Sequence, residues 1–370
     1  MENKQLNYHF LVQKGPAYQI GRRQAAVIKA IPGFRDWFCG NSEEWKERYS
    51  EVAWQTFKKY CPGLIEELQG WADELEVAPH ALVYSQHSYM VPHCSHFFLT
   101  PSMNTTGHLL LARSYEFDIE THDFCLSYTA AEGKYSHLGN TVLFLGRLDG
   151  MNEHHLAVTM SAGGIPRNMV NPLAPPIQEG LQFWAVIRCI LENCRTVEEA
   201  IAWIKQVPLG GNPILMLADA NGNATRVECF GKRVSVQRLN GDREIFYATN
   251  HFQHSDMAAN QSPVMSNSSA REMSIKKFLK EKQVRISPDQ IKTFLSTPYP
   301  DGLDCHFYSE GFGTLYSMIL DTTEGSMDIC FGSPDCNPWN RFNLQDNPAY
   351  LPKEFSIRLP QEKTPQGFWN

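Results

Sequence analysis

The apolar and polar positions of this chain follow one spacing in its first quarter and another in the rest. Between residues 42 and 75, apolar side chains recur at the spacing of one face of an α-helix. Two helices are predicted there, one capped by Ser42 and one with Pro62 in its first turn. A short helix over 80–90 follows, so residues 1–93 are predicted to be mainly helical. The apolar positions of the two longer helices are Trp45, Tyr49, Val52, Ala53 and Phe57, then Leu64, Leu68, Trp71 and Leu75.

The apolar runs that start near residue 94 are shorter and are separated by Gly and Asn turns, which is typical of strands. Strands and helices then come in separate blocks, so the sequence predicts an α+β fold built in layers, not alternating βαβ units. Residues 94–370 are predicted to form this layered region, and residues 1–93 are predicted to fold with them as a single unit. The predicted strands cover 94–100, 107–116, 141–147, 155–161, 213–219, 224–230, 233–238, 244–249, 314–320 and 326–332. The predicted helices cover 178–193, 196–207, 270–282 and 287–296.

Charge and composition exclude some classes of function. A net charge of −7 argues against a nucleic-acid surface. The absence of a long apolar run argues against a membrane span, and the polar residues after Met1 give no sign of a signal peptide. The ten cysteines are scattered without a C-x-x-C pair, so reduced, mostly buried thiols in a cytoplasm are expected. Neither a cofactor motif nor a standard metal-binding spacing is found, so neither is predicted.

Cys94 has a sequence context that suits a nucleophile. It lies between His93 and Ser95, and a turn and a strand lead from it to Arg113 and Glu116. If Cys94 cuts the peptide bond before itself, the freed α-amine, whose pKa is ordinarily about 8, can serve as the base for the thiol. A buried structural cysteine is an alternative interpretation. A Cys–His pair with any of thirteen histidines is another, and both remain open on the residues alone.

Four further residues suit a site around such a cysteine. Arg113 could lower the pKa of the thiol, and Glu116 could hold a new ammonium group. Asn250 ends an apolar strand and could donate to an oxyanion. Taken singly, these residues also suit a solvated ion pair and a turn. Arg271, near a predicted helix start, suits the surface equally well.

Taken in order, these residues resemble the N-terminal-nucleophile (Ntn) amide hydrolases of the choloylglycine hydrolase and penicillin V acylase type. The resemblance is greatest to the acyl-coenzyme A:isopenicillin N acyltransferase branch. It implies a four-layer αββα sandwich with a helical segment before the nucleophile. The segments that carry it are Arg113-Ser114-Tyr115-Glu116, Gly150-Met151-Asn152-Glu153, Asp219-Ala220-Asn221-Gly222, Thr249-Asn250-His251-Phe252, Ser268-Ser269-Ala270-Arg271 and Gly332-Ser333-Pro334-Asp335-Cys336.

The resemblance also implies a role for each matching residue. Cys94 would be the nucleophile, and the bond between His93 and Cys94 the site of self-cleavage. Arg113 would lie beside the thiol, and Asn250 would donate to the oxyanion. Arg271 would complete the polar cluster.

Two positions depart from the family pattern. Glu116 stands where the bile-salt and penicillin V enzymes have aspartate, so its longer side chain must be accommodated, or Asp118 takes its place. Ala162 stands where those enzymes have an asparagine, so the backbone near Ser161 and Ala162 would have to supply the second oxyanion donor. These departures keep open a processing-inactive relative that acts as a binding protein. A papain-like Cys–His hydrolase that needs no cleavage is the third hypothesis.

The implied activity is hydrolysis or transfer of the acyl group of a linear N-acyl amide through a thioester on Cys94. The implied partners are a small-molecule N-acyl amide and the protein's own cleaved N-terminal fragment. An acyl-coenzyme A is a candidate donor, and a homo-oligomer is a candidate assembly.

Overall fold

The computed structural model describes residues 6–31, 33, 35, 39, 43–79, 82, 93–163, 180–258, 264–280, 285–345 and 350–362. The predicted cap at Ser42 and all but residue 82 of the helix predicted over 80–90 lie outside these residues. In the part of the chain that is described, no helix is long and apolar enough to cross a membrane.

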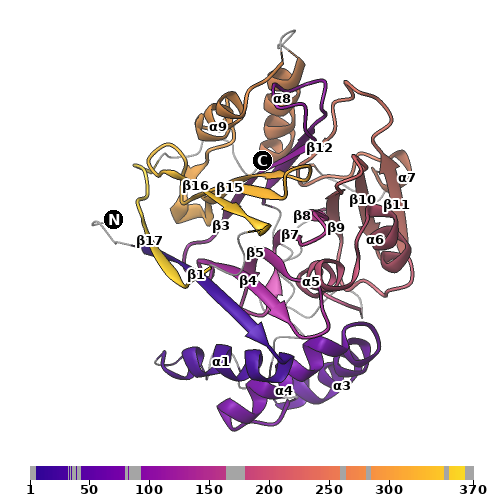
Figure 1. Ribbon diagram of the computed structural model, residues 1–370, viewed down its shortest axis with the longest axis vertical. Coiled ribbons are helices and arrows are strands. Elements are labelled where there is room, and N and C mark those ends of the chain that lie inside the picture. Colours follow the sequence, from indigo (N-terminus) through magenta and orange to yellow (C-terminus); the bar gives the residue numbers. More distant parts are fainter. Residues whose placement is uncertain are drawn as a thin grey trace.

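The described residues form two sheets (Figure 1). Neighbouring strands are antiparallel except β1 and β4, which are parallel. The larger sheet runs in the order β11 (Arg233–Arg238), β10 (Ala224–Phe230), β9 (Pro213–Ala218), β8 (Ala157–Ala162), β7 (Asp149–Asn152), β5 (His137–Val142), β4 (Cys125–Ala131), β1 (Leu6–Gly15) and β17 (Lys353–Ile357), with β6 (Gly146–Arg147) paired to β5. The smaller sheet runs β12 (Tyr247–Ala248), β2 (Ser95–Leu99), β3 (Leu110–Phe117), β14 (Phe312–Asp321), β15 (Ser326–Phe331) and β16 (Trp339–Asn343), with β13 (His306–Phe307) paired to β14.

The two sheets pack face to face and helices cover their outer faces. Tyr8 of the larger sheet stacks on Phe331 of the smaller one, with ring centroids 4.4 Å apart, inside a shared apolar core. Helices α5 (Phe183–Asn193) and α6 (Val197–Ile204) pack on the larger sheet. Helices α8 (Ser266–Lys280) and α9 (Pro288–Ser296) cover the smaller sheet through a separate apolar cluster. The predicted four-layer α+β sandwich is therefore confirmed. Two short elements complete the fold, α7 (Ser255–Ala258) and the 3-10 turn η3 (Tyr308–Glu310).

The described residues before Cys94 are mostly in helices, but their first element is the strand β1. Helices α1 (Ala17–Lys29), α3 (Glu43–Tyr60) and α4 (Pro62–Leu75) lie together at one end of the molecule, opposite α8 and α9 (Figure 1). Strand β1 inserts between β4 and β17, so this segment is part of the larger sheet. Neither β1 nor β4 was predicted. The strand predicted over 141–147 is also wrong, because the chain turns at Leu143 and Phe144, whose φ angles are 52° and 66°.

A buried ion-pair cluster fixes α4 to α5. Arg188 of α5 contacts Glu67 of α4 at 2.8 Å and Glu192 at 2.5 Å, and all three side chains are buried. Because a charge without a partner is costly in a buried position, the three groups depend on one another.

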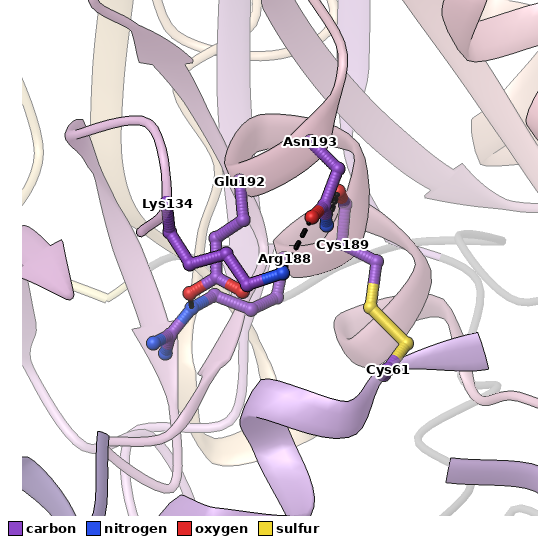
Figure 2. Close-up of a disulfide and its surroundings, with 6 residues drawn as sticks. All are labelled: Cys61, Lys134, Arg188, Cys189, Glu192 and Asn193. Atoms are coloured by element: carbon purple, nitrogen blue, oxygen red, sulfur yellow. Dashed lines mark hydrogen bonds and ion pairs between the residues drawn. A yellow bond between two sulfur atoms is a disulfide. The ribbon is translucent and has the colours of Figure 1, made fainter. Parts of the chain in front are cut away.

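A disulfide joins the same two helices. It links Cys61, the residue before α4, to Cys189 of α5, and Figure 2 shows it beside Arg188 and Glu192. The expectation that all ten cysteines are reduced is therefore wrong for this pair. Disulfides are rare in a reducing cytosol, and the expected cytoplasmic location stays a prediction.

Candidate active site

Cys94 directly precedes strand β2 and is almost completely buried, with 3% of its surface exposed. Its φ angle is 92°, a value that residues with a side chain rarely adopt. Strained backbone of this kind persists where the surrounding contacts enforce it, and it is concentrated at functional sites. Cys94 lines a pocket whose other walls include Tyr115, Met160 and Phe183.

Arg113 holds the sulfur from the neighbouring strand β3. Its Nη2 donates to Cys94 Sγ at 3.2 Å and to the Met160 carbonyl at 2.7 Å. Its Nη1 donates to the Leu148 carbonyl at 2.8 Å and to Asp149 Oδ2 at 2.5 Å. Asp149 is buried and also accepts from the Tyr316 hydroxyl at 2.6 Å. These contacts fix the guanidinium in one orientation, with a donor directed at the thiol.

The thiol is protonated at neutral pH in the uncut chain. Burial raises the pKa of Cys94 to about 11, and the positive charge of Arg113 only partly opposes this effect. A nucleophilic thiolate therefore needs a base. Among the described residues, the hydrogen bond that the sulfur accepts comes from Arg113. This geometry gives no support to a papain-like Cys–His pair.

The backbone nitrogen of Cys94 points at Glu116. It donates to Glu116 Oε2 at 3.1 Å, while Glu116 Oε1 accepts from the Ser114 hydroxyl. Burial raises the pKa of Glu116. The longer side chain of glutamate is thus accommodated, and Asp118 does not take its place, since its carboxylate accepts from the backbone of Glu120.

Asn250 lies against the carbonyl of the bond that precedes Cys94. Its Nδ2 donates to the His93 carbonyl oxygen at 2.7 Å and to the Ala162 carbonyl at 3.0 Å. Its Oδ1 accepts from Arg271 Nη2 at 2.7 Å, which sets the orientation of the amide. A donor held on this oxygen is the arrangement that stabilises an oxyanion when a carbonyl is attacked.

Arg271 lies inside α8 and is fully buried, so its interpretation as a surface residue is wrong. Its Nη1 donates to the Cys94 carbonyl at 2.5 Å and to Ser95 Oγ at 2.9 Å. Its Nη2 also donates to Asn267 Oδ1 at 2.9 Å. Arg271 therefore connects the backbone of the cysteine to the amide of Asn250.

Ser161 and Ala162 lie at the end of β8, next to this cluster. The Ser161 hydroxyl donates to the Thr249 carbonyl at 2.5 Å and contacts His96 Nε2 at 3.2 Å. Ala162 contacts Asn250 through its carbonyl, which is an acceptor. This contact therefore supplies no oxyanion donor, and the backbone donor expected here stays a prediction.

The structure brings together Cys94, Arg113, Glu116, Asn250 and Arg271, and the catalytic roles expected for them stay predictions. Sequence reasoning missed Asp149 and Tyr316, which hold Arg113 in place. Asp149 directly precedes the Gly150-Met151-Asn152-Glu153 segment used for the resemblance, so a local signal existed, but nothing in the spacing paired it with Arg113.

Comparison with known proteins decides the family. The family model described as acyl-coenzyme A:6-aminopenicillanic acid acyl-transferase matches residues 102–336. The chain belongs to this family. The resemblance inferred from the sequence is thereby confirmed. The matched region contains four of the clustered residues, Arg113, Glu116, Asn250 and Arg271, and it begins shortly after Cys94.

Three solved structures are similar to this member of the acyl-transferase family. An ortholog of N-acylethanolamine-hydrolyzing acid amidase from Caenorhabditis elegans is 17% identical, with 62% of this chain and 93% of that chain covered and a TM-score of 0.41. Penicillin V acylase from Agrobacterium tumefaciens is 16% identical, with coverages of 70% and 90% and a TM-score of 0.43. A mutant of conjugated bile acid hydrolase from Clostridium perfringens is 12% identical, with coverages of 74% and 100% and a TM-score of 0.41. No curated protein matches the chain.

Proposed function

We propose that this acyl-transferase family member is a self-processing cysteine amidohydrolase or acyltransferase whose nucleophile is Cys94. The observation that carries the proposal is the contact of Asn250 with the His93 carbonyl, 2.7 Å away, next to a thiol held by Arg113. One carbonyl thus lies beside both a nucleophile and an oxyanion donor, as acyl transfer requires.

Self-cleavage would begin with attack of Cys94 Sγ on the His93 carbonyl carbon. The oxyanion that forms would be stabilised by Asn250, and the thiol proton would pass to the Cys94 nitrogen as the C–N bond breaks. The product is a thioester between the His93 carbonyl and Cys94 Sγ. Water would then attack this thioester, giving a carboxylate on His93 and a free thiol and α-amine on Cys94. The resulting fragments would be residues 1–93 and 94–370.

The freed α-amine would then act as the base for the thiol in the reaction with substrate. Glu116, which contacts the Cys94 nitrogen, would hold the ammonium form. The sulfur would attack the acyl carbon of a linear N-acyl amide, and the amine product would leave with the proton from the ammonium. Water or an acceptor amine would then release the acyl group from the thioester.

Intact-mass analysis of the purified wild-type protein beside Cys94→Ala tests this proposal. The wild type is expected to give two fragments, one ending at His93 and one starting at Cys94, once the disulfide is reduced. Cys94→Ala is expected to remain one chain, because it has no sulfur to attack the carbonyl. An intact wild-type chain that hydrolyses no N-acyl amide would overturn the proposal.

The disulfide gives a second expected result. Cys61 belongs to the first fragment and Cys189 to the second, so the processed wild type should run as one full-length band on a non-reducing gel. With a reducing agent it should separate into two bands. Cys61→Ser should give two bands under both conditions, and Cys336→Ser, which changes a free thiol, should match the wild type. Two bands from the processed wild type without reductant would contradict this bond.

A further inference from the structure

Most residues that line the pocket beside Cys94 are apolar, and the polar ones include an adjacent pair, His122 and Asp123; His93, Thr121 and Thr141 also line it. Apolar side chains dominate the lining, and they are Tyr115, Phe117, Val142, Leu143, Leu148, Met160, Ala162 and Phe183. His122 and Asp123, from the loop between β3 and β4, also line it. Two adjacent polar residues in such a wall suggest recognition of a specific group on the ligand, since polar groups in apolar pockets fix orientation and specificity.

Each of these two residues keeps one buried polar atom without a hydrogen-bond partner among the described residues. In His122, Nδ1 accepts from the backbone nitrogen of Phe124 at 2.9 Å, and Nε2 is left unpaired. In Asp123, Oδ2 accepts from Thr141 Oγ1 at 2.6 Å and from the Phe144 nitrogen at 2.9 Å, and Oδ1 is left unpaired. A buried polar atom without a partner is unfavourable, so a ligand that pairs with it is favoured.

The free atom of His122 is a donor. Burial lowers the pKa of His122 to about 3, so the ring is neutral. Because Nδ1 accepts a hydrogen bond, the ring proton lies on Nε2. Burial raises the pKa of Asp123 to about 7, so a substantial fraction of this carboxyl carries a proton near neutral pH. With Oδ2 accepting two hydrogen bonds, that proton belongs on Oδ1, which then also donates.

The polar pair lies one aromatic ring away from the catalytic cluster. The Tyr115 ring lies 5.0 Å from the Arg113 guanidinium carbon and 5.4 Å from the His122 ring. Arg113 in turn contacts the sulfur. A ligand group that meets His122 is therefore separated by several carbon atoms from an acyl carbon at Cys94. The positive charge of Arg113, which also lowers the pKa of His122, disfavours a cationic group there.

We propose that His122 and Asp123 select acyl groups that carry a neutral oxygen acceptor, a ketone or hydroxyl, several carbons away from the scissile amide. The proposal rests on the proposed function in one respect, the position of the acyl carbon at Cys94. It names the substrate class as amides of oxygenated acyl chains and makes His122 and Asp123 specificity-determining residues. The apolar wall would hold the carbon chain, and the two donors would bind the oxygen.

A binding experiment tests this without requiring turnover. Amides of octanoic acid, one plain and the others with a ketone moved one carbon at a time along the chain, are titrated into full-length Cys94→Ala by calorimetry. At one ketone position the amide is expected to bind about tenfold more tightly than the plain amide, as a hydrogen bond to a buried donor allows. His122→Phe in this background should abolish the difference in affinity between the ketone amide and the plain amide.

Asp123→Asn provides a second variant, because its amide can keep the contacts with Thr141 and Phe144 and still present a donor. It should retain most of the preference. Equal binding of the plain and every ketone amide to Cys94→Ala would overturn the proposal, as would an unchanged preference in His122→Phe. The processed wild type is then assayed on the same amides. If it hydrolyses none while Cys94→Ala keeps the preference, the proposed function fails and the recognition pair stands.

Discussion

Asn250→Asp is expected to slow self-cleavage by about 100- to 1000-fold, the cost of losing one oxyanion donor. The substitution keeps the size of the side chain and the oxygen that accepts from Arg271. It replaces the amide donor, now 2.7 Å from the His93 carbonyl, by an oxygen that repels a developing oxyanion. The measurement is the fraction of uncut chain over time, from reduced gels and intact mass.

Asn267→Asp is the matched control. Asn267 lies in α8 and contacts the same guanidinium at 2.9 Å. Asn267→Asp makes the same chemical change, amide to carboxylate, at the other asparagine side chain that accepts from Arg271. It should therefore slow cleavage by less than about tenfold. If both variants slow cleavage equally, Asn250 acts through Arg271 and not as an oxyanion donor. If neither does, the role assigned to Asn250 is wrong.

Arg188→Met is expected to lower the free energy of unfolding by about 3–5 kcal/mol, the usual cost of removing one member of a buried ion pair. The change leaves the carboxylates of Glu67 and Glu192 buried near each other without their cation. Burial and the charge of Glu192 raise the pKa of Glu67, and the charge of Arg188 opposes that rise. Without Arg188, the two carboxylates would partly take up protons. Equilibrium unfolding in urea, at fixed pH and with the disulfide intact, measures the loss.

Arg238→Met is its counterpart on the surface. Arg238 pairs with Glu198 at 2.6 Å, but the two side chains are 48% and 59% exposed. Exposed ion pairs contribute little, so the expected loss is below about 1 kcal/mol. Similar losses in the two variants would show that the buried cluster does not depend on charge pairing.

The layered fold could be predicted because helical and strand spacing occupy separate stretches of the chain. Strand β4 could not be predicted in this way. Both of its faces are covered, and the buried polar residues Ser127 and Thr129 interrupt the apolar pattern. Strand β1 was missed for another reason: only three of its ten side chains are buried, and one of these is the polar Gln13, so its apolar alternation is weak.

The site was predictable where residues could be matched to a family pattern in order, as for Arg113 and Asn250. The contacts that support the site could not be predicted, because they join distant parts of the chain. Asp149 meets Tyr316 across 167 positions, and Cys61 meets Cys189 across 128. Local spacing carries no information about such pairs. These residue pairs form only when the two sheets and their helices pack together.

The position of β1 has a consequence for how the mature enzyme can be produced. A gene that starts at codon 94 would bypass the scission step, but its product would lack the strand between β4 and β17. Both neighbours would then present open edges, which promote aggregation. Residues 1–93 would therefore remain part of the folded enzyme after the proposed cleavage. Both polypeptides must be present while the larger sheet assembles.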